Sequence, residues 1–292
     1  MRSLLKSFVM IVRLINWREL RTGIAFCPLC GRRRVVIKLD TNEMAVRCLS
    51  CRASAATMSI VSVFRRVAPD ISLMEVYEMS SRGPLFRYLK KNAKKLVSSE
   101  YFSDVAPGEY RNGVQCQDVQ QLTYPDHAFD ICTSTEVFEH VPDDVKGFSE
   151  IFRVLRPNGF FIFTVPLLRE HETVERALIT PNGELQYLHT PEYHEDPLRA
   201  SKILAFRTYG WDIADRLRKA GFFTVEIVAP EYSIPWGYSR PVVIAYRGPA
   251  TKQVNPTEAK VPPVMVTPGN NGSVIMAKMK TDVFIFPGLW YS

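Results

Sequence analysis

The sequence predicts an α/β protein, in which a parallel sheet is covered by helices on both faces and a small metal-binding module comes first. From about residue 70, short apolar segments of strand length alternate with amphipathic segments of helix length. One of the apolar segments, residues 160–165, is apolar on both sides, as a central parallel strand is. Two Cys-x2-Cys pairs within residues 1–66 predict the module.

Composition excludes several classes of protein. The chain has 292 residues, of which 46% are hydrophobic and 23% charged, so wholesale disorder is excluded. No apolar run reaches the roughly 18 residues of a membrane-spanning helix, so we expect no transmembrane segment. Residues 1–66 hold 13 Lys and Arg against 3 Asp and Glu, a balance of +10, so the other residues sum to −3 in a chain of net charge +7. The basic character therefore belongs to the N-terminal module.

Cys27, Cys30, Cys48 and Cys51 have the spacing of a four-thiolate zinc site, because 17 residues separate the two pairs. Each Cys-x2-Cys loop turns two sulfurs toward one point, and Gly31 tolerates the positive φ of a tight loop. Two disulfides, or four unrelated thiols, are the alternatives. Disulfides need an oxidising compartment, and no secretory leader is evident, so we expect a structural zinc ion and a cytoplasmic protein.

Between the cysteine pairs, residues 32–39 and 44–46 predict a β-hairpin, which together with the metal makes a zinc ribbon. Its arginines either contact phosphates or an acidic partner, or are solvated on a structural clip. Residues 1–20 predict a basic amphipathic helix that packs on its own protein or makes a peripheral contact with a membrane surface or a protein.

The main body reads as strands and helices in alternation. Asp143 or Asp144 is expected to cap the central helix, which ends at residues 157–159. Gly83-Pro84 opens an earlier helix, and Gly221 stops a later one. The expected strands are residues 71–77, 96–98, 114–116, 129–133, 160–165, 223–228 and 242–246, and the last helix is residues 211–220.

Polar side chains follow the first four expected strands. Glu78 follows the first, Glu100 the second, Asp118 the third, and Thr135 the fourth. Because parallel strands end at the same edge of a sheet, these residues predict a ligand site there. Glu100 suits the two hydroxyls of a ribose, and Asp118 suits an adenine amino group. For any one of these acids, a helix cap or a surface charge is the alternative.

Residues 129–166 resemble the central block of class I S-adenosylmethionine-dependent methyltransferases. The residues that carry the resemblance are Asp130 at the strand, the turn Glu139-His140-Val141, and the helix end Arg153-Val154-Leu155-Arg156-Pro157. The resemblance covers roughly residues 70–248 and implies a Rossmann-like, doubly wound, seven-stranded sheet whose last strand is antiparallel. It implies that S-adenosylmethionine binds at the strand tips, through Glu78, Ser80, Gly83, Glu100, Asp118, Val119 and Thr135.

The chain departs from that family in its cofactor loop, which holds one glycine where three are usual. The hydroxyls of Ser80 and Ser81 and the guanidinium of Arg82 are expected to bind the cofactor carboxylate instead. The expected domains are residues 1–66, the helix and ribbon; 67–248, the methyltransferase domain; and 249–292, a Pro-rich tail with an apolar end.

Methyl transfer needs a base only where the acceptor must lose a proton. His140 and His194 are the candidate catalytic residues, and the wider set of possible bases adds Glu139, His171, His189 and Tyr193. Glu139 and His140 serve alternatively to shape their turn. Residues 167–201 are expected to build an acceptor pocket or lid; a solvated loop and a metal site are the alternatives.

The resemblance therefore implies a methyltransferase that acts on a small metabolite or a sugar-containing intermediate. Two other functions stay open. The basic ribbon would guide RNA to the enzyme, or the glycine-poor loop would mark a non-catalytic binding scaffold.

Overall fold

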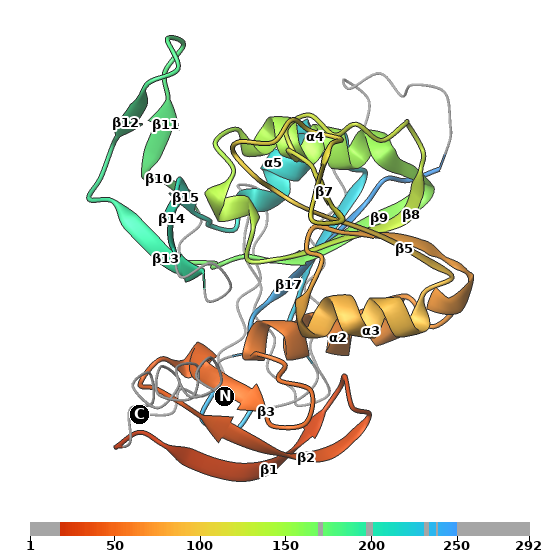
Figure 1. Cartoon of the computed structure of the whole chain (residues 1–292), viewed down its shortest axis with the longest axis vertical. Coiled ribbons are helices and arrows are strands. Elements are labelled where there is room, and N and C mark those ends of the chain that lie inside the picture. The colour runs from red at the N-terminus through yellow and green to blue at the C-terminus, as the bar shows by residue number, and fades with distance from the viewer. Residues whose placement is uncertain (1–17, 169–171, 197–200, 231–233, 238, 250–292) are drawn as a thin grey trace, which may run out of the picture.

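The computed structural model describes residues 18–168, 172–196, 201–230, 234–237 and 239–249. Its centre is an eight-stranded sheet with the order β16-β17-β9-β8-β4-β5-β7-β6 (Figure 1). The strands are β4 (Glu75–Glu78), β5 (Lys95–Glu100), β6 (Tyr110–Arg111), β7 (Val114–Cys116), β8 (Phe129–Thr135), β9 (Leu155–Thr164), β16 (Thr224–Val228) and β17 (Val242–Tyr246). The predicted α/β class is confirmed.

The five strands β7, β5, β4, β8 and β9 run parallel, and β17 is antiparallel to both of its neighbours, as expected of the last strand. The expected count of seven strands is wrong by one. The additional strand is β6, two residues that fold back on β7 as a short antiparallel hairpin. Strand order along the sheet brings the ends of β4, β5, β7 and β8 together at one edge.

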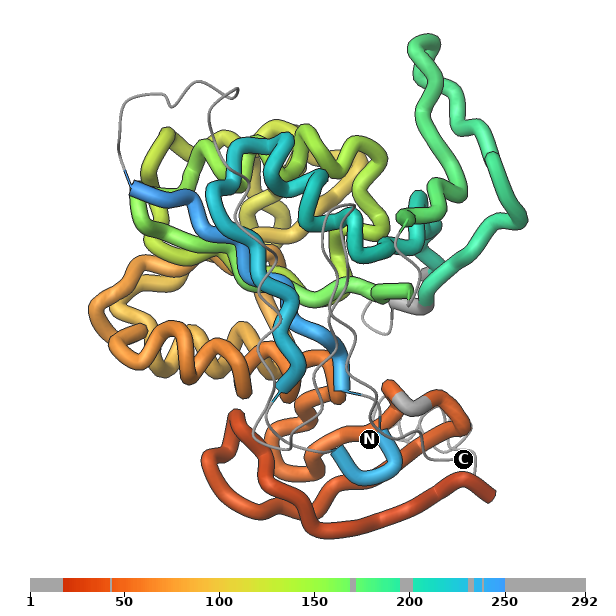
Figure 2. Tube along the Cα trace, turned by 180° about the vertical axis from the view of Figure 1, so that it is seen from behind, coloured from red at the N-terminus to blue at the C-terminus, as the bar shows by residue number. Residues whose placement is uncertain are grey.

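Helices cover both faces of the sheet, because residues along its strands alternate between two apolar cores. They are α2 (Ala55–Val67), α3 (Gly83–Asn92), α4 (Asp144–Val154) and α5 (Ile213–Lys219). On β4, Val76 packs with α2 and α3, whereas Tyr77 packs with α4 and α5. Figure 2 shows the two helix pairs on opposite sides of the sheet. None of the helices in the described part of the chain is long and apolar enough to cross a membrane.

Several predicted boundaries shift. Residues 71–77 do not form one strand: η2 (Ile71–Leu73) is a 3-10 turn, and β4 begins at Glu75. The turn at residues 157–159 lies inside β9 as an irregularity of its pairing with β8, so the helix ends earlier, at Val154. Asp143 is the cap of α4, since its side chain accepts a hydrogen bond from the Lys146 N–H at 3.0 Å.

The N-terminal module is a three-stranded antiparallel sheet made of β1 (Arg21–Cys27), β2 (Arg32–Lys38) and β3 (Val46–Cys48). The predicted hairpin corresponds to β2 paired with β3, but its second strand was placed too early, because Glu43–Ala45 form a 3-10 turn and β3 begins at Val46. Sequence reasoning missed β1. It also missed α2, which crosses the expected boundary at residue 66. Met58 of α2 belongs to the module's core, whereas Phe64 belongs to the core of the main sheet. The helix therefore couples the two.

Residues 172–196 and 201–208 form short two-stranded ladders beside the main body. They are β10 (Val174–Glu175) with β15 (Arg207–Thr208), β11 (Ala177–Ile179) with β12 (Leu185–Tyr187), and β13 (Glu192–Asp196) with β14 (Ser201–Ala205). The β11–β12 pair projects away from the body as an arm (Figure 1). The expected amphipathic helix at the N-terminus and the Pro-rich tail fall on residues 1–17 and 250–292, outside the described residues.

Candidate functional site

The predicted site residues meet at the edge where β4, β5, β7 and β8 end. Glu78 is the last residue of β4, Glu100 of β5 and Thr135 of β8, and Asp118 follows β7 by two residues. The pairings Glu78 with Ser98 and Glu78 with Thr133 place β5 and β8 on either side of β4. The parallel topology therefore gathers the four tips, as the sequence pattern predicted.

Glu78 is buried at this edge, with 2% of its surface exposed. Its carboxylate accepts a hydrogen bond from the Thr133 hydroxyl on β8. Burial, the largest cause, raises the pKa of Glu78 to about 8, with the Thr133 hydrogen bond acting to lower it and the nearby charge of Glu100 acting to raise it. A neutral carboxyl at the tip of β4 can donate a hydrogen bond as well as accept one.

We expect this carboxyl to make the protein less stable as pH rises from about 5 to about 8. The folded protein keeps a proton that the unfolded chain loses in this range, so the free energy of unfolding falls by up to about 1.4 kcal/mol per pH unit. Urea unfolding of the wild type and Glu78→Gln at several pH values measures the effect. The stability of the wild type relative to the variant should fall across this range. A difference that stays constant with pH would contradict the raised pKa.

The loop that follows β4 folds over Glu100. One carboxylate oxygen of Glu100 accepts hydrogen bonds from the Ser81 N–H and the Ser81 hydroxyl, both at 3.0 Å, and from the Ser80 hydroxyl at 3.2 Å. The Arg82 guanidinium lies 3.5 Å from the same oxygen. The groups expected to hold a cofactor carboxylate thus bind Glu100 in this structure. Gly83 has φ +91, and a Cβ there would meet no atom within 4 Å, so the backbone conformation alone requires glycine.

Asp118 and Val119 make local contacts at the tip of β7. One Asp118 oxygen accepts hydrogen bonds from the Gln120 backbone N–H at 2.9 Å and from the Gln120 side-chain amide at 3.1 Å. Its charge raises the pKa of the half-exposed Tyr101, whose partial burial is the larger cause. Val119 packs against the core shared with α4. The roles predicted for Asp118 and Val119 toward adenosine stay predictions.

Buried polar atoms without a partner gather at the tips of β8 and β9. In the described part of the chain, six of the nine buried side-chain N and O atoms that lack a hydrogen bond belong to Ser134, Thr135, Glu136, Glu139 and Thr164, with Glu139 contributing two. Buried polar groups in native proteins are almost always hydrogen-bonded, so a concentration of exceptions at one place calls for partners such as water, an ion or a ligand.

The turn after β8 brings both candidate catalytic histidines together, although 54 positions separate them. His140 lies in η3 (Phe138–His140), His194 lies in β13, and their ring centres are 4.9 Å apart. Glu139, His140 and His194 each offer a ligand atom within 4.8 Å of the others. His189 and Tyr193 are exposed and do not join this group. His171 lies outside the described residues.

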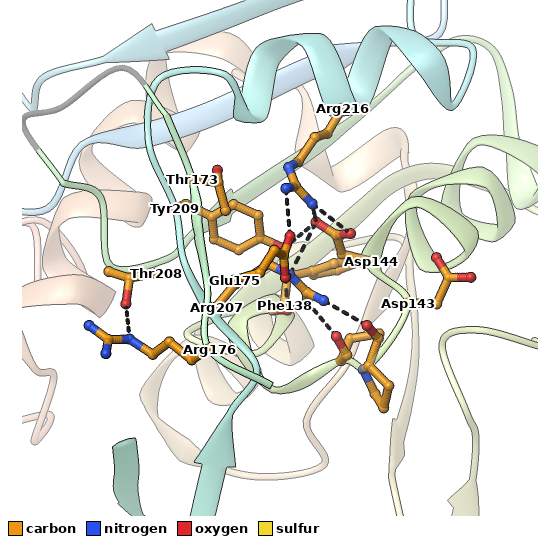
Figure 3. A network of polar contacts seen from close by, with 12 residues as sticks. Phe138, Asp143, Asp144, Thr173, Glu175, Arg176, Arg207, Thr208, Tyr209 and Arg216 are labelled. Carbon is orange, nitrogen blue, oxygen red and sulfur yellow. Dashed lines mark hydrogen bonds and ion pairs between the residues drawn. The ribbon is translucent and has the colours of Figure 1, made fainter. Parts of the chain in front are cut away.

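Two arginines that sequence reasoning missed hold this turn. Arg240 binds Glu136 at 2.9 Å, and Glu136 itself has a positive φ of +53. Arg207 is 3% exposed and contacts the Glu175 carboxylate at 3.1 Å (Figure 3). Its remaining N–H groups donate to the backbone carbonyls of Phe138, Val141 and Pro142. No signal in the sequence pairs these arginines with a turn 65 to 104 positions away.

The network around Arg207 continues to α5. Asp144, buried in the first turn of α4, binds Arg216 at 3.1 Å and accepts a hydrogen bond from the Tyr209 hydroxyl at 2.9 Å. Arg216 also reaches Glu175 at 2.6 Å. Figure 3 shows these side chains converging from β10, β15, α4 and α5. These contacts hold the ladder β10–β15 against the turn that carries Glu139 and His140.

Cys27, Cys30, Cys48 and Cys51 converge in the N-terminal module, and all six cysteines of the chain are free thiols. The Cys27 and Cys51 sulfurs are 3.6 Å apart, far beyond a disulfide bond of roughly 2.05 Å. Zn–S bonds of about 2.3 Å in a tetrahedron put two sulfurs roughly 3.8 Å apart, so the spacing fits a zinc site. The loops are alike: the Gly31 N–H donates to the Cys27 carbonyl, and the Arg52 N–H donates to the Cys48 carbonyl.

Comparison with known proteins gives a match over part of this site. Residues 80–163 match the family described as methyltransferase domain. Over these residues the chain is similar to that family. The match begins in the loop after β4 and runs to the end of β9, so it includes the loop over Glu100, the acids at the tips of β5 and β7, and the turn with Glu139 and His140.

Named relatives match this chain over short lengths. A probable S-adenosylmethionine-dependent methyltransferase of Mycolicibacterium smegmatis is 29% identical over 34% of this chain and 35% of its own length. A sterol 24-C-methyltransferase of Gibberella zeae is 34% identical over 30% of this chain and 17% of its own length. A sarcosine/dimethylglycine N-methyltransferase of Halorhodospira halochloris is 32% identical over 27% of this chain and 29% of its own length. The chain thus spans about a third or less of these relatives.

Among solved structures, an S-adenosylmethionine-dependent methyltransferase of Mesorhizobium loti is similar with a TM-score of 0.43 and 16% identity, over 65% of this chain and 98% of that one. A 1,6-didemethyltoxoflavin-N1-methyltransferase of Burkholderia thailandensis has a TM-score of 0.44 and 17% identity, over 66% and 78% of the two chains.

Proposed function

We propose that this protein is an S-adenosylmethionine-dependent methyltransferase whose acceptor is a small metabolite or a sugar-containing intermediate. The observation that carries the proposal is the edge at which β4, β5, β7 and β8 end, beside and within residues 80–163, which match the methyltransferase domain family. Acids stand at three of the tips. At the fourth stand buried polar atoms that have no hydrogen bond within the described residues.

In this proposal Glu100 accepts hydrogen bonds from the ribose hydroxyls, and Asp118 with Val119 frames the adenine. Glu78, Ser80, Gly83 and Thr135 surround the remainder of the cofactor. When bound, S-adenosylmethionine supplies a methyl group on a positively charged sulfur, which an acceptor displaces in line. The protein's own part is to align the acceptor and exclude water. The buried, uncharged Glu78 at the tip of β4 is placed to donate a hydrogen bond to the bound molecule.

The names of two relatives favour a small acceptor, since one specifies a sterol and the other sarcosine and dimethylglycine. One observation favours RNA as the second candidate. A pocket of about 330 Å³ lies between the cysteine loops and α3, and its lining includes Arg65, Arg87 and Lys91. A small acceptor would be methylated at a rate that changes little with salt, whereas binding of RNA would weaken steeply as salt rises.

We propose further that the four cysteines hold a structural zinc ion and that the protein acts in the cytoplasm. The converging thiols support the first statement, and six cysteines without a disulfide are consistent with the second. The zinc would fix the ends of β1, β2 and β3 at one point, because Cys27 ends β1, Cys48 ends β3, and Cys30 precedes β2.

The test is calorimetric titration with S-adenosylmethionine. We expect Glu100→Ala to weaken binding by roughly 1–3 kcal/mol, because two ribose hydroxyls lose a charged partner. Glu100→Gln keeps an oxygen that can accept from the Ser81 N–H, so the loop should stay anchored in this variant. Comparison of the two variants therefore separates the loss of the loop contact from the loss of the charge that binds the ribose. Glu184→Ala, which removes an exposed acid on the β11–β12 arm, is the control.

Unchanged affinity in Glu100→Ala would disprove the role given to β5. Absence of binding at millimolar cofactor would favour the scaffold over the enzyme. The acceptor follows from incubating the protein with methyl-labelled cofactor and a cell extract. We expect the label in the small-molecule fraction, and label in the RNA fraction would select the second candidate.

A further inference from the structure

We propose that Glu139, His140 and His194 bind one divalent transition-metal ion, at a site separate from the four cysteines. The sequence predicted the two histidines as candidate bases. The structure assigns them, together with Glu139, to the binding of one shared cation instead. Two imidazole nitrogens and one carboxylate oxygen form a ligand set that suits manganese, iron, cobalt or zinc in the divalent state and that leaves coordination positions open.

The spacing of the three ligand atoms carries the first part of the argument. One oxygen of Glu139 lies 3.8 Å from His140 Nε2 and 3.7 Å from His194 Nδ1. Both distances are too long for a hydrogen bond. They are close to the roughly 3 to 3.5 Å that two ligands of one ion keep between them when each bond is about 2.0–2.2 Å. The three groups face one point, and neither histidine is within hydrogen-bond distance of the Glu139 oxygen.

The burial of Glu139 is the second argument for the metal site. Its side chain is 1% exposed, and within the described residues neither carboxylate oxygen has a hydrogen-bond partner. An ionised carboxylate in such a place is costly unless a cation joins it. The two arginines whose charge reaches Glu139 are bonded to other groups: Arg207 to carbonyls and Glu175, and Arg240 to Glu136. The negative charge of Glu136 beside it adds to the attraction for a cation.

The third argument comes from the hydrogen bonds that each histidine makes with the ring nitrogen turned away from Glu139. His140 Nδ1 is 2.8 Å from the Leu204 carbonyl, which can only accept, so Nδ1 carries the proton and Nε2 turns a lone pair toward Glu139. His194 Nε2 is 3.2 Å from the Glu192 carboxylate, which leaves the lone pair of Nδ1 toward Glu139. Glu192 is itself held by Arg176 at 2.9 Å. Histidine ligands of metals typically have this arrangement, with the outer nitrogen donating to a carbonyl or carboxylate.

The site lies in the turn after β8, beside the edge at which methyl transfer is proposed. Resting on the proposed function, we infer that the open positions of the ion bind the acceptor through an oxygen atom, such as a hydroxyl or a carboxylate. Metal removal should then abolish methyl transfer and leave the affinity for S-adenosylmethionine unchanged. Loss of cofactor binding as well would instead indicate a general loss of the fold.

Manganese tests the metal site without any acceptor. Mn²⁺ prefers nitrogen and oxygen ligands to thiolates, so zinc held by the cysteines is not displaced. The full-length protein is titrated with Mn²⁺, and the free ion is counted by electron paramagnetic resonance. We expect one ion per chain, and at least about tenfold weaker binding in Glu139→Gln, His140→Ala and His194→Ala. His189→Ala, which removes an exposed histidine of the arm, is the matched control and should bind as the wild type does.

Thermal unfolding of each variant shows whether it folds. Glutamine has nearly the same shape as glutamate, so Glu139→Gln removes the carboxylate without leaving a cavity. His194 is about one-third exposed, so its replacement by alanine should be tolerated. These two variants keep the test valid if His140→Ala is unstable. One ion that His189→Ala retains and the folded ligand variants lose supports the site. No stoichiometric binding by the wild type, or binding that survives in any folded ligand variant, overturns it and leaves Glu139 and His140 as residues that shape their turn.

Discussion

Removal of the zinc ion proposed for the four cysteines is expected to unfold β1, β2 and β3 together with the first turn of α2, while the main sheet stays folded. The apolar core of this module is small and includes Cys27 and Cys48 themselves. Binding of structural zinc contributes roughly 10–16 kcal/mol in zinc-finger peptides, so a module of this size depends on its metal. Ala55 and Met58 of α2 pack in the same core and should lose their order with it.

Hydrogen exchange with and without a chelator measures this effect along the chain. We expect protection to be lost in β1–β3 and at the start of α2, and retained in β4, β8 and β9. Cys48→Ser should reproduce the chelated state. Cys116→Ala, which removes a buried thiol of β7, should keep the module intact. A single cooperative transition of the whole protein would contradict the prediction, because it would mean that α2 transmits the unfolding to the main sheet.

Substitution of Arg207 by methionine is expected to lower the free energy of unfolding by about 3–5 kcal/mol. Methionine fills a similar volume but cannot donate to the carbonyls of Val141 and Pro142. The Phe138 carbonyl keeps the Tyr209 hydroxyl, and Glu175 keeps Arg216. Asp144, buried in the same network, keeps Arg216 but loses the neighbouring charge of Arg207. The turn that carries Glu139 and His140 should loosen as well, since Arg207 binds the carbonyls on both sides of these residues.

Chemical denaturation of Arg207→Met and of a surface control measures the difference. Arg111→Met removes a partly exposed pair with Asp104, and exposed pairs of this kind contribute at most about 1 kcal/mol. Arg207→Lys should recover only part of the stability, because an ammonium lacks the planar fork that reaches several acceptors at once. An effect of Arg207→Met no larger than that of the surface control would show that the buried network adds nothing to stability.

Local patterns predicted most of the strands, the cap at Asp143, the cysteine cluster and the acids at the strand tips. These features depend on residues close in sequence, or on the rule that parallel strands end at the same edge. Predictions were wrong where tertiary packing overrides local preference. Residues 71–73 have strand-like composition but form a 3-10 turn, and α2 was missed although it joins the two apolar cores.

The amino-acid sequence by itself determined the fold class, the pairing of the cysteines around one point, and the order in which acidic residues reach the sheet edge. Periodicity and spacing are local properties, so they can be read without coordinates. Only the tertiary structure decided three further features. Glu100 is covered by its own loop, Glu139 is buried with no hydrogen bond to its carboxylate among the described residues, and His194 reaches His140 across 54 positions. Those outcomes depend on contacts between distant segments, held here by Arg207 and Leu204, and no local pattern encodes such contacts.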